Sequence, residues 1–264
     1  MKERLDVLLV NKGLAESREK AKKIIMAGLV SVEGSIEDKA GTKFNTDVEI
    51  IVKGKECPYV SRGGLKLEKA IKKWGISCED AICVDMGAST GGFTDCMLQH
   101  GAVKVYSIDV GYGQLDYKLR SDPRVINIEK TNIRYLNTEL IQDSVDLVTI
   151  DVSFISLKHI LPVAASILAT DGHVLCLIKP QFEAGKEQVG KGGIIKDSNV
   201  HIQVIKNVIN YSKDSDLYPE ALTFSPIKGN KGNIEFLLLL SPKTCDNNID
   251  VLQVVEASHK TYKI

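Results

Sequence analysis

With 264 residues, 44% of them hydrophobic and 26% charged, the chain has the composition of a globular protein with room for one large α/β domain and a small second one. Its apolar runs are far shorter than the roughly 18 residues that span a bilayer, and no signal-like segment follows the charged residues 1–4. Its six cysteines are scattered without a C-x-x-C pair. We therefore expect a cytoplasmic protein with no membrane partner, disulfide framework or metal site, and no oligomeric state is favoured.

The formal net charge is zero, from 34 basic and 34 acidic residues, but the two signs are unevenly distributed. Residues 1–75 contain 16 Lys and Arg against 11 Asp and Glu, a balance of +5, which leaves 18 against 23, or −5, for the rest. The N-terminal end is therefore the part of the chain whose charge favours nucleic acid.

The first fifth of the chain has the pattern of a compact α+β unit. Apolar residues in 5–9 predict a short helix, and a second helix is N-capped by Ser17 and ended by Gly28. Residues 30–32 and 48–52 predict strands. The sequence predicts two helices packed against a small sheet.

The basic residues of this unit follow a recognisable order. Arg4-Leu5-Asp6, Ser17-Arg18, Ala21, Gly28 and the run V-S-V-E-G from position 30 resemble an S4-type RNA-binding domain. In that family a basic helix and an adjoining strand face RNA phosphates. The alternative is a solvated helix face, which most lysine-rich stripes are. The resemblance implies RNA contacts by Arg4, Arg18, Lys20, Lys22, Lys23 and Arg62.

A domain boundary is predicted where Pro58 ends the preceding strand, since proline cannot continue a hydrogen-bonded ladder. We assign residues 1–57 to the first domain, 58–64 to a linker and 65–264 to the second domain. A helix follows with Lys66 in its first turn, where the helix macrodipole disfavours a positive charge. This placement suggests that Lys66 has a role other than stabilising the helix.

A glycine-rich turn at 87–92 joins a predicted strand, residues 81–84, to a helix that includes Phe93. A second strand, 103–108, ends in Asp109, and an acidic residue there accepts hydrogen bonds from ribose hydroxyls. The turn lacks the G-x-G-x-x-G spacing that cradles a pyrophosphate. We therefore expect a cofactor with an adenosine but no phosphates, and a dinucleotide oxidoreductase is the disfavoured alternative.

The later strands are predicted at 124–128, 146–150, 174–178, 221–225 and 233–240. A helix is expected through Leu168, followed by a turn at residues 171–172. Polar residues follow the fourth and fifth strands of the sheet at the edge where open α/β sheets bind ligands. They are Asp151 and Lys179.

The run D-x-G-A-S-x-G-G-F-T from Asp85 resembles the S-adenosylmethionine loop of FtsJ-type ribose methyltransferases, and Y-V-S-R-G-G-x-K-L from Tyr59 is similar to the TlyA family. The resemblance implies a Rossmann-like domain with a mostly parallel seven-stranded sheet and an antiparallel final strand. It implies a K-D-K-E tetrad with Lys179 as a candidate base, formed by Lys66, Asp151, Lys179 and Glu235. The implied S-adenosylmethionine contacts are Asp85, Gly87, Ser89, Thr90, Gly91, Gly92, Phe93, Asp109, Asn132 and Asp151.

The expected function is 2′-O-methylation of a ribose in ribosomal RNA, with cytidine as the expected nucleoside and ribosomal subunits as partners. Two alternatives remain: an RNA-binding assembly factor with an inactive methyltransferase fold, and a membrane-active hemolysin, a label that relatives in the family carry. The sequence itself favours neither, because it has the tetrad and lacks a long apolar or amphipathic span.

Overall fold

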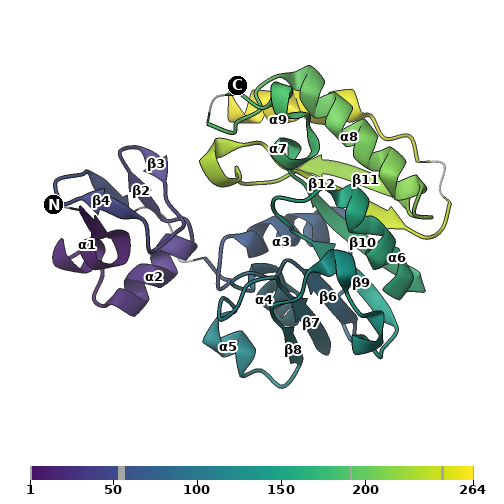
Figure 1. Ribbon diagram of the computed structural model, residues 1–264, viewed down its shortest axis with the longest axis horizontal. Helices are drawn as coiled ribbons and strands as arrows, with labels where there is room; N and C mark the ends of the chain where they lie inside the picture. Colours follow the sequence, from purple (N-terminus) through teal and green to yellow (C-terminus); the bar gives the residue numbers. More distant parts are fainter. Residues whose placement is uncertain (1, 53–56, 191, 245–246, 264) are drawn as a thin grey trace.

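The computed structural model describes residues 2–52, 57–190, 192–244 and 247–263. It consists of a small N-terminal unit and a larger α/β unit (Figure 1). None of the described helices is both long and apolar enough to cross a membrane. Lys55 and Glu56, which belong to the segment expected to end the first domain, lie outside the described residues.

The N-terminal unit packs two helices against two small antiparallel sheets, one pairing β1 with β4 and the other ordered β3-β2-β5. As expected, Ser17 caps the second helix by accepting a hydrogen bond from the backbone N–H of Lys20 (3.1 Å). Strands β1, β3 and β4 were not expected, because each has at most one apolar residue and so no alternating pattern. The elements are β1 Lys2–Arg4, α1 Leu5–Asn11, α2 Arg18–Met26, β2 Val30–Val32, β3 Ser35–Ile36, β4 Lys43–Asn45 and β5 Ile50–Val52.

The larger unit is built on a seven-stranded sheet in the order β11-β12-β10-β9-β6-β7-β8. β12 runs antiparallel to both of its neighbours, and the pairs from β10 to β8 are parallel. This arrangement confirms the expected fold class. The strands are β6 Ile82–Met86, β7 Lys104–Ile108, β8 Val125–Ile128, β9 Val145–Ile150, β10 Leu168–Ile178, β11 Tyr218–Phe224 and β12 Phe236–Ser241.

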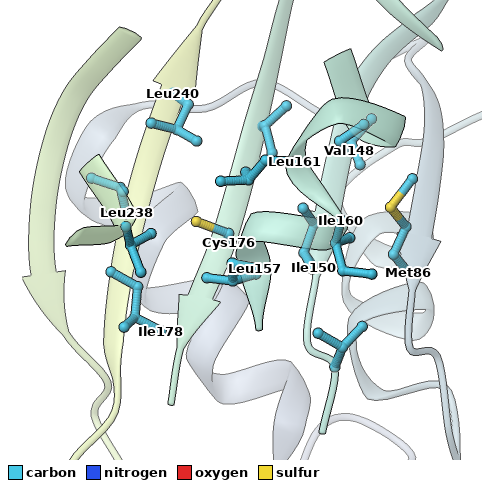
Figure 2. Close-up of a cluster of buried hydrophobic side chains, with 14 of the residues drawn as sticks. Met86, Val148, Ile150, Leu157, Ile160, Leu161, Cys176, Ile178, Leu238 and Leu240 are labelled. Atoms are coloured by element: carbon cyan, nitrogen blue, oxygen red, sulfur yellow. The ribbon is translucent and has the colours of Figure 1, made fainter. Parts of the chain in front are cut away.

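Helices cover both faces of this sheet, because alternate strand residues point to opposite sides. Met86, Val148 and Cys176 belong to a core shared with α6, α8 and α9 (Figure 2), whereas Cys83 and Leu175 face a second core under α3 and α4. The helices are α3 Gly63–Trp74, α4 Gly92–Gln99, α5 Tyr117–Arg120, α6 Leu161–Ile167, α7 Pro180–Glu183, α8 Ser198–Lys213 and α9 Val251–Tyr262.

The start of β10 differs from the expectation. The preceding helix ends at Ile167, and residues 171–172 lie inside the strand instead of forming a turn before it. The register of β10 against β9 shifts between Leu168 and His173, so the strand absorbs the Asp-Gly pair as an irregularity. Glycine is needed there, because a Cβ on Gly172 would lie 2.8 Å from the carbonyl oxygen of Val145.

Candidate active site

The glycine-rich turn after β6 brings the backbone close to the neighbouring strand end. Gly87 has φ +92°, and a Cβ on it would lie 2.7 Å from the carbonyl oxygen of Asp151. Gly91, with φ +93°, is the N-cap of α4. Both positions need glycine, since a side chain would strain the backbone or clash. The turn thus presents main-chain atoms at the carboxyl end of the sheet.

Asp85 links the strand before the glycine-rich turn to the helix after it. Its side chain is buried, and its Oδ2 accepts hydrogen bonds from the backbone N–H (2.9 Å) and the hydroxyl (2.7 Å) of Thr94 in α4. Burial raises the pKa of Asp85 to about 7, although the bonds from Thr94 favour the ionised form. The carboxylate therefore joins β6 to α4.

Asp109 supports the same turn from the next strand. Its Oδ2 accepts from the backbone N–H of Ser89 (2.8 Å), and its Oδ1 accepts from that of Gly111 (2.6 Å). Asn132 is exposed, and its side chain caps a short 3₁₀ helix by accepting from the N–H of Arg134 (3.1 Å). Neither Asp109 nor Asn132 lines the cavity next to the turn.

That cavity has a volume of about 520 Å³ and is walled by both units of the protein. The turn and the tetrad line one part of it, and residues of the N-terminal unit, from Met26 of α2 onward, line another. Of the residues expected to bind the cofactor, Gly91 lies outside the lining together with Asp109 and Asn132. The lining from the turn and tetrad is Asp85, Gly87, Ser89, Thr90, Gly92, Phe93, Lys66, Asp151, Lys179 and Glu235, and that from the N-terminal unit is Met26, Asp38, Lys39 and Ala40.

The four tetrad residues form a continuous chain of alternating charges. Glu235 Oε2 lies 2.7 Å from Lys66 Nζ, and Lys66 Nζ lies 3.5 Å from Asp151 Oδ2. On its other side, Asp151 Oδ1 lies 2.6 Å from Lys179 Nζ. The four come from α3, from the ends of β9 and β10, and from the residue before β12. The sequence separates them widely, and the sheet brings them together.

Burial makes these charges dependent on one another. Burial alone would raise the pKa of Asp151, but the ammonium groups of Lys179 and Lys66 outweigh it and lower that pKa to about 2. Burial alone would lower the pKa of Lys66, yet Asp151 and Glu235 together raise it. No group of three or more His, Cys, Asp or Glu side chains suited to a metal ion occurs in the described ranges.

Comparison with known proteins identifies this architecture. A family model described as "FtsJ-like methyltransferase" matches residues 59–241, and one described as "S4 domain" matches residues 3–50. The chain belongs to the FtsJ-like methyltransferase family. Family membership confirms the expected enzyme class and S-adenosylmethionine as its cofactor.

Several relatives of this FtsJ-like methyltransferase align with almost the whole chain. A "Putative rRNA methyltransferase YqxC" of Bacillus subtilis is 51% identical over 99% of this chain and 96% of the relative. The "16S/23S rRNA (cytidine-2'-O)-methyltransferase TlyA" of Mycobacterium tuberculosis is 40% identical over 97% of this chain and 96% of the relative. A solved structure titled "Putative hemolysin from Streptococcus thermophilus" is 47% identical, with a TM-score of 0.78, over 99% of this chain and 97% of that one.

Two features of the methyltransferase site were not expected from the sequence. Ser153 Oγ accepts a hydrogen bond from Lys179 Nζ (2.9 Å). Phe154, 90% exposed, has φ +64° and contacts the ring of Phe182, with centroids 4.9 Å apart. Both phenylalanines line the cavity. A bulky residue at positive φ marks a constrained backbone that no sequence pattern reveals.

The expected RNA-binding residues fall into three groups. Arg4 and Arg18 both pair with the buried Asp6, with N–O distances of 2.9 Å, and so stabilise the N-terminal unit. The remaining lysines, Lys20, Lys22 and Lys23, have exposed side chains on α2.

Arg62 instead lies between the two units. It pairs with Asp38 (2.6 Å), and its side chain lies where a Cβ on Gly28 would clash. Its backbone N–H donates to the carbonyl oxygen of Met26 (3.3 Å). The structure therefore places Arg62 as a connection between the units and a wall residue of the cavity.

Proposed function

We propose that the protein methylates a ribose 2′-hydroxyl of ribosomal RNA, with the tetrad as its reaction centre. The observation that carries this proposal is the alternating chain Glu235–Lys66–Asp151–Lys179, which shares one cavity with the glycine-rich turn. An inactive assembly factor would have no need to keep four charges buried beside a cofactor turn, because buried charges destabilise a fold unless they are paired and hydrogen-bonded.

The glycine-rich turn fits the adenosine cofactor of the family. A side chain at Gly87 would clash with the end of β9, and Ser89, Thr90 and Gly92 line the cavity. We assign these residues to cofactor binding, with Asp109 holding the turn in place through Ser89. When bound, S-adenosylmethionine supplies an electrophilic methyl group on a sulfonium.

Lys179 is the proposed base for the ribose hydroxyl. A 2′-hydroxyl is a weak acid, so a side chain that accepts its proton during methyl transfer accelerates the reaction. Lys179 projects into the cavity from the end of β10, and Asp151 and Ser153 fix its amino group at 2.6 and 2.9 Å. In its ion pair with Asp151, Lys179 is an ammonium, so it releases a proton to solvent before it accepts the one from the ribose. Asp151 then stabilises the ammonium that forms again. Glu235 and Lys66 hold Asp151 in place.

Phe154 and Phe182 supply a surface on which a base can stack. Single-stranded RNA is recognised by aromatic side chains that stack on unpaired bases, and enzymes that act on a nucleotide take it out of its helix. Phe154 is almost fully exposed at the cavity, and its backbone adopts an unfavourable conformation to hold it there. The pair would position the target nucleotide with its ribose toward Lys179.

The wider substrate follows from the relatives and from the N-terminal unit. Relatives 40% and 35% identical carry names that specify cytidine-2'-O methylation of rRNA, so cytidine in ribosomal RNA is the proposed target. The exposed lysines of α2 would contact RNA phosphates, which supports ribosomal subunits as the proposed partners and the cytoplasm as the proposed site of action.

The test is methyl transfer from labelled S-adenosylmethionine to ribosomal subunits that lack the modification. We expect the wild type to label a single class of nucleoside, and digestion to give a 2′-O-methylated product. Lys179→Ala should retain cofactor binding and lose labelling. Absence of labelling by the wild type, with RNA binding intact, would instead support an assembly factor.

A further inference from the structure

The loop that carries Glu235 into the tetrad is the connection between β11 and β12, residues 225–235. Glu235 is buried, and its backbone carbonyl accepts a hydrogen bond from the N–H of Ser225 (2.8 Å) at the other end of the loop. Gly229 packs directly on the carboxylate, where an added Cβ would overlap Glu235 Oε1. The position of Glu235 therefore depends on the path of this loop.

The last turn of α9 holds the start of that loop. The hydroxyl of Tyr262 donates to the carbonyl oxygen of Ser225 (2.7 Å), and its ring meets the ring of Phe224 edge-on, with centroids 6.0 Å apart. Lys228 of the loop also contacts Tyr262. Its Nζ donates a hydrogen bond to the carbonyl oxygen of Tyr262 (3.4 Å) and lies 5.2 Å from the centroid of the Tyr262 ring. Tyr262 thus contacts two positions of the loop and the last residue of β11.

Tyr262 and Phe224, which hold the start of the loop, lie in segments that are each fixed by a further contact. His259, one turn before Tyr262, lies against His201 of α8, with ring nitrogens 2.9 Å apart. On the opposite side, Lys69 of α3 donates to the carbonyl oxygen of Phe224 (2.5 Å) and lies over its ring. Burial raises the pKa of Tyr262, with Glu235 adding to the rise, so the hydroxyl stays protonated as a donor.

We propose that Tyr262 is a positioning residue for methyl transfer, acting on Lys66 through Ser225 and Glu235. This inference rests on the proposed function. Lys66 lies nearer to Glu235 (2.7 Å) than to Asp151 (3.5 Å). If the loop shifts and Glu235 withdraws, Lys66 moves toward Asp151 and competes with Lys179 for the same carboxylate.

Tyr262→Phe in the full-length protein tests the proposal, because it keeps the ring contacts and removes only the hydroxyl. With saturating cofactor and unmodified ribosomal subunits, the single-turnover rate should fall about 3- to 10-fold, the effect of one lost hydrogen bond. The dissociation constant of S-adenosylmethionine should not change. Tyr106→Phe is the matched control, since it removes a tyrosine hydrogen bond to Asp143 outside the cavity lining and should leave the rate unaltered.

A double-mutant cycle with Glu235→Gln separates positioning from a general structural effect. If Tyr262 acts through Glu235, the Phe substitution should reduce the rate much less in the Glu235→Gln background than in the wild type. Equal fractional losses in both backgrounds, or an unaffected rate for Tyr262→Phe in an active wild type, would overturn this inference alone. A wild-type protein that transfers no methyl group would refute the proposed function as well.

Discussion

Replacing Lys179 with Met removes the proposed base while keeping a side chain of similar length. The change deletes the amino group that lies 2.6 Å from Asp151 Oδ1 and 2.9 Å from Ser153 Oγ. General-base assistance contributes about 100- to 10,000-fold to a rate. The single-turnover rate should therefore fall by at least about 100-fold, which corresponds to roughly 3 kcal/mol of activation free energy.

The same substitution should also lower stability, because Lys179 helps to keep Asp151 ionised. The pKa of Asp151 is lowered from 3.8 to about 2, a shift worth at most about 2 kcal/mol in the free energy of unfolding. A lowered carboxyl pKa stabilises the fold fully above pH 3.8, and this contribution disappears as the pH falls to about 2. At neutral pH the Met variant should lose part of this amount, since Lys66 still lies 3.5 Å from the carboxylate.

Lys179→Arg separates the two effects. Arginine preserves the positive charge beside Asp151 but cannot act as a proton acceptor. We expect urea denaturation to show near-wild-type stability and rapid-quench methylation, with saturating cofactor and RNA, to show a rate as low as that of the Met variant. Near-normal methylation by the Arg variant would refute the base assignment and leave Lys179 as a charged orienting group.

Three further changes probe other parts of the structure. Asp109→Ala should weaken S-adenosylmethionine binding by roughly 1.5–3 kcal/mol in calorimetry, since charge-assisted hydrogen bonds that hold the turn are lost; unchanged affinity would contradict this. Lys22→Ala should reduce the salt slope of ribosome binding by about 1, whereas Lys206→Ala on α8 should not. His201→Leu should reduce the loss of stability that acidification causes. Burial lowers the His201 pKa from 6.5 to about 4, so between these pH values the unfolded chain binds more protons than the folded one. This difference lowers the free energy of unfolding by roughly 3 kcal/mol across the interval. An unchanged pH profile would exclude His201 as the source.

The sequence predicts the sheet well because its strands follow local patterns, whereas the tetrad was implied by the resemblance to a known family. Apolar runs mark the strands, and the carboxyl ends of parallel strands meet at one edge. Asp151 and Lys179 follow adjacent strands, so their contact follows from the strand order. The antiparallel β12 then brings Glu235 to the same edge from the other chain direction.

Contacts between the units could not be predicted, because no local pattern encodes them. Arg62 resembled an RNA contact by its charge, and only the fold reveals Asp38 as its partner. The sequence likewise does not reveal that the buried Asp6 pairs with both Arg4 and Arg18, whose side chains remain 44% and 56% exposed. A formal charge shows where basic residues occur, and the fold shows which of them also form ion pairs within the protein.

Helix α2 contributes both to the basic surface of the N-terminal unit and to the wall of the cavity. The helix carries Lys22 and Lys23 on its surface, and its last residue, Met26, lines the cavity. Lys23 and Met26 lie within one turn of the same short helix. A displacement of α2 would therefore move the basic surface and the cavity wall together.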